Sequence, residues 1–269
     1  MMRARAAMGR IWNAYKVELT KAGRSRYTWL LPLLLIAAVC LMPLMQPLAR
    51  DGAADYRFVA YATRAAVNIL GLIMLVAYSA ALVSAELGSG TACMSLLRPL
   101  HRHEFVAAKL LLAFTYAALI GVIAGVASWV VAALFGDLTG VSYGGEAVYS
   151  NLSMVCAYLL GLVLALFPLC SSAAYGVMVS SMTRSTGAAV GSAVGIWVLL
   201  DVVKYPLRIA PFLFSSWIEA PWNVFVGRAD GLDPEWMPDA ALTVVVSLVW
   251  TAVFSVAAAF SVSRRNLQP

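Results

Sequence analysis

Six long apolar segments, nearly free of charged side chains, dominate this chain of 269 residues. A bilayer core is about 30 Å thick, and roughly 20 apolar helical residues are needed to cross it. The predicted spans are 28–48, 65–84, 106–135, 151–180, 187–205 and 240–262. The first is not a signal peptide, because its apolar stretch is too long and no small-residue cleavage site follows. We therefore predict an all-α integral membrane protein with one transmembrane domain over residues 1–269.

The composition excludes the other broad classes of protein. Hydrophobic residues make up 62% of the chain and charged residues 12%, whereas a soluble domain has about 45–50% and about 25%. A disordered chain needs low hydrophobicity and high charge, which this sequence lacks. The four cysteines form no Cys-x-x-Cys pair, so neither a zinc site nor a disulfide framework is predicted. We expect no metal and no cofactor in this chain.

The Lys and Arg residues predict the orientation of the spans. With the N-terminus inside, 13 of the 19 fall in cytoplasmic segments and six in outer loops, as the positive-inside rule requires. Both termini are therefore predicted to be cytoplasmic, in a bacterial inner membrane. The net charge of +6 points to membrane lipids with anionic headgroups rather than to nucleic acid, since no soluble domain presents a basic face.

Two segments outside the spans carry interfacial patterns. Residues 8–26 are predicted to form an amphipathic helix at the membrane surface, with an apolar stripe of Ile11, Trp12, Tyr15, Leu19 and Ala22. The outer loop 206–239 is predicted to be a re-entrant or interface-lying cap, because aromatic rings favour the headgroup level. Its tryptophans are Trp217, Trp222 and Trp236.

The cytoplasmic loop 85–104 carries the most specific pattern, within "SAELGSGTACMSLLRPLHRHEFVAAKLL". A carboxylate stands where a span meets the cytoplasm, and a Gly-Thr pair, an apolar patch, Arg-Pro and a second carboxylate follow. These residues are Glu86, Gly90, Thr91, Met94, Leu97, Arg98 and Glu104. Their order and spacing resemble the membrane subunits of ATP-binding-cassette (ABC) type-2 exporters. The helix over 8–26 is similar to the elbow helix of that family.

The resemblance implies a function for the loop. In the family it forms a short coupling helix that docks on a separate cytoplasmic ATPase, which binds ATP and magnesium. It implies two copies of the ATPase and a second, identical permease subunit, so that a dimer forms the path. His101 and His103 depart from the family pattern, so no charged contact is carried over there. From the residues themselves, Glu86 is expected to pair with Lys109 or Arg102 and to hold the angle of the loop.

Two other classes of protein remain as alternatives to an exporter. The chain has no Gly-x-x-x-x-Gly-Lys-Ser/Thr sequence, so it encodes no phosphate-binding loop, and ATP hydrolysis is expected in a partner. An intramembrane enzyme is disfavoured because both histidines lie in the cytoplasmic loop and no His-Glu-x-x-His sequence exists. A membrane accessory or assembly factor that moves nothing is compatible with the composition. We predict that the chain itself is not an enzyme.

Further candidates lie within the spans. Gly187, Gly191 and Gly195 form a small-residue face that favours close helix packing, within the subunit or against a second copy. Asp201 and Lys204, near the outer end of the fifth span, are expected to form a local ion pair that snorkels to the outer surface, with a substrate contact as the alternative. The polar candidates for a substrate path, each with an alternative role as a helix–helix hydrogen bond, are Asn68, Tyr78, Ser171, Ser172, Tyr175 and Asn223. The sparsely polar spans favour an amphiphilic substrate, namely a lipid, hydrophobic peptide or antibiotic.

Overall fold

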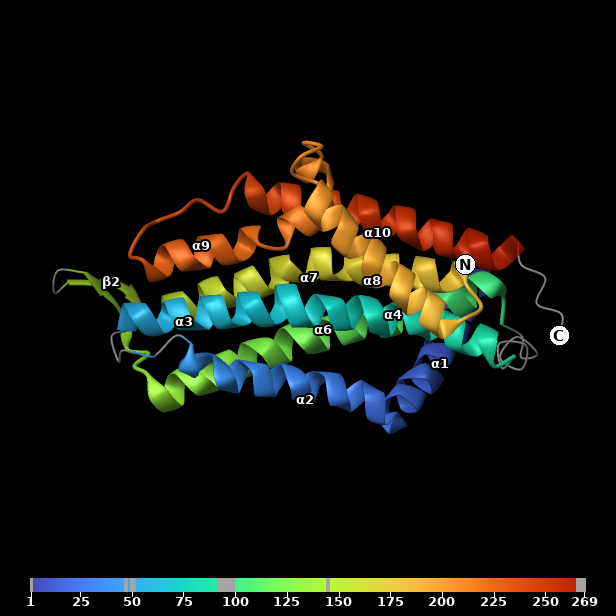
Figure 1. Ribbon diagram of the computed structural model, residues 1–269, viewed down its shortest axis with the longest axis horizontal. Helices are drawn as coiled ribbons and strands as arrows, with labels where there is room; N and C mark the ends of the chain where they lie inside the picture. The colour runs from blue at the N-terminus through green and yellow to red at the C-terminus, as the bar shows by residue number, and fades with distance from the viewer. Residues whose placement is uncertain (1, 46–47, 49–51, 91–99, 144–145, 265–269) are drawn as a thin grey trace.

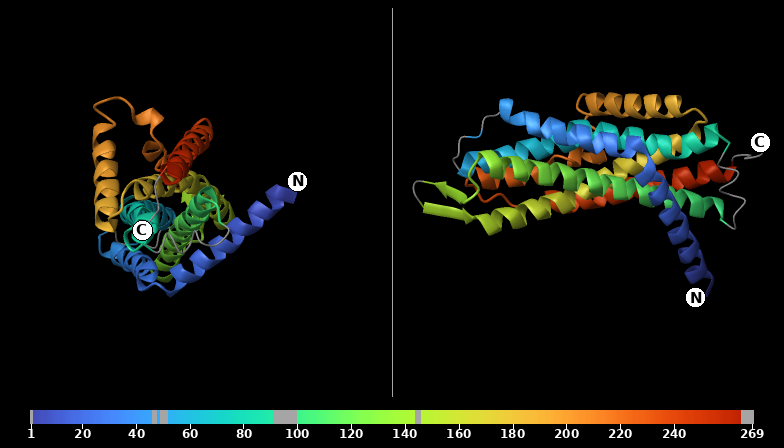
Figure 2. Two further views of the ribbon diagram at one scale, coloured as in Figure 1. Left: turned by 90° about the vertical axis from the view of Figure 1, so that its right-hand side faces the viewer. Right: turned by 90° about the horizontal axis from the view of Figure 1, so that it is seen from below.

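Six helical stretches of the described residues are long and apolar enough to cross a membrane, which confirms the predicted fold class. The computed structural model describes residues 2–45, 48, 52–90, 100–143 and 146–264. Most of the helices run side by side along one axis and form an elongated bundle (Figure 1), whereas α1 leaves the bundle at an angle (Figure 2). The helices are α1 (Met2–Arg24), α2 (Arg26–Leu41), α3 (Gly52–Ala65), α4 (Leu72–Gly88), α6 (Arg102–Phe135), α7 (Asn151–Met182), α8 (Thr186–Val203), α9 (Ala220–Ala229) and α10 (Asp239–Arg264).

The two ends of the bundle differ. One end carries α1, the end of α4, the start of α6 and the end of α10, and we call it the terminal end (Figure 2). The opposite end, the hairpin end, carries strands β1 (Gly140–Tyr143) and β2 (Glu146–Ser150). The strands are antiparallel, with Val141 opposite Tyr149. Because both strands lie between α6 and α7, the hairpin closes the connection between these two long helices.

The second span is longer than predicted and is interrupted. Its helical stretch covers Asp55–Gly88, and a π-helical turn over Ala66–Gly71 separates α3 from α4. Arg57 and Arg64, which the charge pattern assigned to an outer loop, therefore lie on a helix. They remain compatible with a helix because each pairs with α9 or its flanks, Arg57 with Asp230 and Arg64 with Glu219. From the sequence alone these two charged residues suggested a loop, because their partners on other segments could not be known.

Helix α7 occupies the centre of the bundle and packs against α4, α6, α8, α9 and α10. Its approach to α4 depends on small residues: a Cβ on Gly176 would lie 2.6 Å from Ser79 Cβ. One turn later, Ser180 Oγ accepts hydrogen bonds from the backbone N–H groups of Val83 and Ser84, at 3.0 and 2.8 Å. Small residues let two backbones approach where the hydrophobic effect does not drive helices together.

The outer loop folds back along the bundle. It forms 3₁₀ turns over Ala210–Phe212 and Phe214–Trp217 and then α9, which packs on α3 and α7. Trp222 is fully buried, and its ring lies 5.7 Å from that of Tyr158 on α7. Trp217 and Trp236 are half-buried. The interior position of Trp222 identifies α9 as a packed element of the bundle rather than a surface cap.

Candidate functional site

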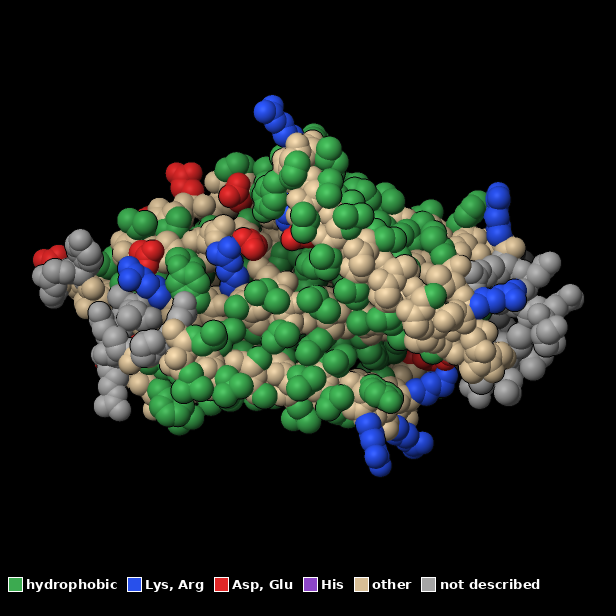
Figure 3. Space-filling view, viewed as in Figure 1, with side chains coloured by type: hydrophobic (Ala, Val, Ile, Leu, Met, Phe, Trp, Pro, Cys, Tyr) green, Lys and Arg blue, Asp and Glu red, His purple; other side chains and the backbone are tan. Residues whose placement is uncertain are grey.

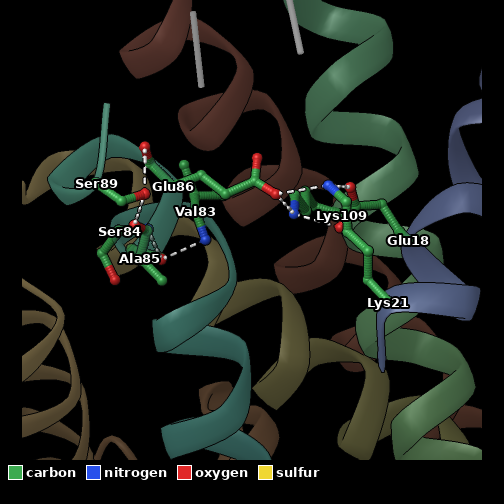
Figure 4. A network of polar contacts seen from close by, with 9 residues as sticks. Glu18, Lys21, Val83, Ser84, Ala85, Glu86, Ser89 and Lys109 are labelled. Atoms are coloured by element: carbon green, nitrogen blue, oxygen red, sulfur yellow. Dashed lines mark hydrogen bonds and ion pairs between the residues drawn. The ribbon is translucent and has the colours of Figure 1, made fainter. Parts of the chain in front are cut away.

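Four charged side chains meet at the terminal end, where α4 ends and α6 begins (Figure 4). Lys109 Nζ on α6 lies 2.8 Å from Glu86 Oε1 on α4 and 2.5 Å from Glu18 Oε2 on α1. Lys21 Nζ, one turn along α1, lies 2.8 Å from Glu18 Oε1 and 3.2 Å from Glu86 Oε1. We call these four residues the charge network. It joins three helices at the two ends of the predicted coupling loop.

The charge network is balanced and largely shielded from solvent. Two carboxylates face two ammonium groups, and the side chain of Lys109 is only 3% exposed, whereas that of Lys21 is 51% exposed. Burial raises the pKa of Glu18, but the ammonium groups of Lys109 and Lys21 outweigh it and hold that pKa below its ordinary value. The Glu18 and Glu86 carboxylates likewise raise the pKa of Lys21, against the lowering effect of burial. Glu18 and Lys21 are therefore expected to be charged near neutral pH.

A second ion pair anchors the start of α6 to the start of α1. The guanidinium of Arg10 contacts both carboxylate oxygens of Glu104, with its Nη2 2.5 Å from Oε1. Glu104 is fully buried, and its Oε2 also accepts a hydrogen bond from the backbone N–H of His101 at 3.0 Å. The same carboxylate thus caps α6 and binds α1. Capping by Glu at the third helical position explains why α6 begins at Arg102.

Two further contacts extend this junction. Tyr15 on α1 forms a hydrogen bond of 2.8 Å with Thr115 on α6. Arg102 donates to the carbonyl oxygen of Ser263 at the end of α10, at 2.8 Å. The first two turns of α6 therefore connect α1, α4 and α10, so a displacement of the loop before α6 acts on three other helices at once.

Helix α1 turns its polar side toward the bundle. Arg10, Tyr15, Glu18 and Lys21 all reach α6 or α4, as the contacts above show. Trp12 and Leu19 of the predicted apolar stripe stay 52% and 42% exposed. This arrangement suits a helix at the membrane surface, because the exposed apolar side chains meet lipid while the polar ones are paired within the protein.

Of the predicted coupling residues, Glu86 and Glu104 lie in this junction. Gly90 follows the end of α4 with a φ of +70°, a left-handed conformation that glycine adopts at no steric cost. Thr91, Met94, Leu97 and Arg98 lie outside the described residues. The expected pairing of Glu86 with Lys109 is confirmed. The rings of His101 and His103 stack with centroids 5.5 Å apart.

Arg10, Glu18 and Lys21 are the residues of this junction that pattern reading missed. One signal was available, since Glu18 is the only acidic residue among the first 50. A single carboxylate in a basic helix already has several cations nearby on the same helix, so the sequence gives no reason to expect a more distant partner. Its pairing with Lys109, 91 residues away, depends on how α1 packs and has no periodic signal.

Most of the predicted path residues form bonds between or within helices. Ser171 Oγ bonds to the carbonyl oxygen of Ser247 on α10 at 2.7 Å, and Tyr175 donates to that of Ala193 on α8 at 3.0 Å. Ser172 bonds within its own helix to the carbonyl of Pro168. Asn223 on α9 accepts from Arg64 at 3.0 Å. These contacts account for four of the six polar side chains without a substrate.

Asn68 differs from the other five, since the side chain of Tyr78 hydrogen-bonds to Thr28 on α2. Asn68 lies in the π-helical turn, and both atoms of its amide are shielded from solvent without a hydrogen-bond partner among the described residues. Tyr78 stacks on Tyr116 of α6 with ring centroids 4.0 Å apart. A π-helical turn widens a helix and is frequent at functional sites, so Asn68 keeps its place as a predicted path residue.

The small-residue face of α8 is not used inside the subunit. Gly187, Gly191 and Gly195 are all exposed, and a Cβ on any of them would meet nothing within 4 Å. The buried residues of α8 are Ala189 and Ala193, which lie on the opposite side of the helix at 100° per residue. The sequence left two possible partners for this face, another helix of the same subunit or a second copy. Among the described residues, no helix of the same subunit packs on it.

Comparison with known proteins identifies the family. The sequence profile of the ABC-2 family transporter proteins matches residues 14–198, well over half of the chain. The chain belongs to the ABC-2 transporter family. The match covers α1 from its middle, loop 85–104, the first four spans and most of the fifth, so the whole charge network lies within it. No curated protein matches the chain at a significant level.

Membership of the ABC-2 family, together with the six apolar helices, makes this chain a multi-pass membrane protein of a transport system. The family consists of transporter membrane proteins, which agrees with the prediction that the chain is a transport subunit. The predicted resemblance to the ABC type-2 permease family is confirmed. The charge network is accordingly a feature of an ABC-2 permease.

Proposed function

We propose that this ABC-2 protein is the permease subunit of an exporter in the bacterial inner membrane, driven by two copies of a separate cytoplasmic ATPase. ATP and magnesium bind in that partner. The terminal end of the bundle faces the cytoplasm, and loop 85–104 docks on the ATPase. The substrate is an amphiphile such as a lipid, hydrophobic peptide or antibiotic, because the spans carry few polar groups.

The observation that carries the proposal is the pair of ionic junctions at the start of α6. Glu86 lies at the start of the loop, Glu104 at its end and Lys109 just after it, and both junctions include α1 (Figure 4). When the ends of a loop are not held by contacts to the rest of the protein, the loop bends under a force from a docked partner and does not transmit it. Here both of its ends are tied to a third helix, so a push on the loop moves α4, α6 and α1 together. This stiffness is what coupling to an ATPase requires.

Docking is tested by copurification. The chain is co-expressed with each ABC ATPase of the source cell, and the partner that copurifies is reconstituted with it in lipid nanodiscs. Met94→Ala with Leu97→Ala is expected to abolish copurification, because an apolar patch on the loop supplies the contact. Leu33→Ala is the control, since Leu33 on α2 is 61% exposed on the outside of the bundle. Retention of the ATPase by the double variant would refute docking at this loop.

We further propose that two identical copies meet along the glycine face of α8. Exposed small residues let two helices approach closely in lipid, and no helix of the same subunit occupies this face within the described residues. In a variant without native cysteines, Gly191→Cys is expected to form a cross-linked dimer on mild oxidation. Val126→Cys, which is 59% exposed on α6, is expected to stay monomeric. Equal cross-linking at both positions would contradict the assignment of this face.

A further inference from the structure

The chain between α8 and α9 lies beside the middle of α10 rather than beside either of its ends. Trp250 Nε1 donates to the carbonyl oxygen of Phe212 at 2.7 Å, and the Phe214 ring lies 5.7 Å from that of Phe254. Trp250 is eleven residues from the start of α10 and fourteen from its end, which is about 16 and 21 Å at about 1.5 Å per residue. Figure 1 shows this segment, in orange, projecting from the bundle half-way along it.

The backbone of this segment is not α-helical. Helix α8 ends at Val203, and Arg208 follows with a φ of +55°, a left-handed conformation unusual for a residue with a side chain. Ile209 N–H then bonds back to the carbonyl of Lys204 at 3.1 Å. Irregular backbone occurs at membrane depth only where protein buries it or where it lines a water-filled cavity.

This subunit buries Lys204 and Phe214 but leaves much of the segment exposed. Tyr205, Leu207 and Phe212 are 68%, 60% and 73% exposed, and Arg208 is also exposed. Figure 3 shows a basic side chain at the tip of the projection, among hydrophobic ones. Contact with lipid would leave backbone polar groups without partners in hydrocarbon. The exposed side of the segment must therefore meet protein or water.

The charges on the segment favour water. Asp201 and Lys204 form the predicted ion pair, with Nζ and Oδ1 2.5 Å apart, and Lys204 Nζ also lies 5.1 Å from the centre of the Tyr205 ring. The guanidinium of Arg208 has no hydrogen bond or ion pair with any described residue, although the backbone N–H of Arg208 bonds to the carbonyl of Tyr205 at 3.1 Å. Charged side chains at mid-membrane face a bundle interior or a water-filled cavity and mark transport paths. The segment 201–208 carries one net positive charge, and its unpaired group is the guanidinium of Arg208.

Snorkelling does not explain Arg208. Long basic side chains reach the membrane surface when they lie near a helix end at the interface. The neighbouring turns are instead level with Trp250, near the middle of α10, with about 15 Å of hydrocarbon toward each surface of a bilayer core. A guanidinium at this depth is favourable when it is hydrated or paired with an anion.

We propose that residues 201–213 line a water-filled path between two copies of the chain and that Arg208 binds an anionic group of the transported amphiphile there. The inference rests on the proposed pairing of two permeases. A phosphate or carboxylate fits the planar donor fork of an arginine, which binds such groups through two hydrogen bonds. Because Lys204 is paired with Asp201, the guanidinium of Arg208 is the cation of this segment that is available to bind the substrate.

Cysteine labelling tests whether the segment meets water. In a variant without native cysteines, Tyr205→Cys and Phe212→Cys are treated in nanodiscs with a membrane-impermeant, charged methanethiosulfonate. Both are expected to react at least about ten times faster than Leu248→Cys, the matched control. Leu248 is 52% exposed and lies two residues from Trp250 on α10, so at about 100° per residue it is on the opposite side of the helix from the segment. Equally slow reaction at all three positions would overturn the inference, as would Tyr205→Cys forming a disulfide between copies without reacting with the reagent.

A second measurement isolates the charge of Arg208. The rate ratio of an anionic ethylsulfonate reagent to a cationic trimethylammonium reagent is measured at Phe212→Cys. Arg208→Gln is expected to lower this ratio several-fold, and Arg208→Lys to preserve it, because an unpaired cation attracts the anionic reagent. An unchanged ratio in Arg208→Gln would overturn the anion site. Neither measurement needs the ATPase, so failure of copurification and failure of labelling are separate results.

Discussion

Replacing Lys109 with alanine is expected to lower the free energy of unfolding by about 3–5 kcal/mol, the usual cost of removing one partner from a buried ion pair. The Lys109 side chain is 3% exposed and lies between Glu18 and Glu86. Its loss leaves two largely buried carboxylates together, with only the half-exposed Lys21 beside them. The change is measured by chemical denaturation of the purified permease in mixed micelles. In the complex with the ATPase, we also expect the rate of ATP hydrolysis to be the same with and without the variant permease.

The matched control for Lys109 is Lys21, a residue of the same type in the same network. Its side chain is 51% exposed, so Lys21→Ala is expected to cost under about 1 kcal/mol, as exposed ion pairs do. The double variant Glu18→Gln with Lys109→Met is expected to be more stable than Lys109→Ala, because it removes one of the stranded charges. Equal destabilisation by Lys109→Ala and Lys21→Ala would show that burial does not set the strength of this network.

Replacing Arg10 with methionine is expected to release the first half of α1 from the bundle. Glu104 is fully buried, and Arg10 is the side chain that neutralises it. Without Arg10, the carboxylate keeps only the backbone N–H of His101, and an uncompensated buried charge costs about 3–5 kcal/mol. The expected result is at least a ten-fold faster hydrogen exchange of the α1 amides around Arg10, with ATP hydrolysis that continues but no longer drives transport.

Arg24→Met controls for the loss of a basic residue from α1, since Arg24 is exposed and has no ion pair with a described residue. It is expected to leave hydrogen exchange in α1 unchanged. Glu104→Gln in the Arg10→Met background is expected to restore much of the protection, because a neutral amide is cheaper to bury than a carboxylate. If Arg24→Met and Arg10→Met loosen α1 to the same extent, the Arg10–Glu104 pair does not anchor the helix.

Local pattern was sufficient for much of the fold. Apolar runs of span length predicted six crossing helices, and α7 runs from Asn151 to Met182, close to the expected 151–180. The Glu86–Lys109 and Asp201–Lys204 pairs were also within reach, because each joins residues close in sequence. Where charged residues lay inside a helix, as Arg57 and Arg64 do in α3, the same reasoning placed the boundary too late.

Composition, hydropathy and the loop motif determined that this protein is an all-helical membrane permease of the ABC-2 family, because span length and lipid solvation act on each segment separately. The tertiary structure decided the rest. The pairing of Glu18 with Lys109, the free glycine face of α8 and the contact of Phe212 with Trp250 on α10 all depend on which helix faces cross. No periodicity within one helix records that, since contacts between helices are set by the packing of distant segments.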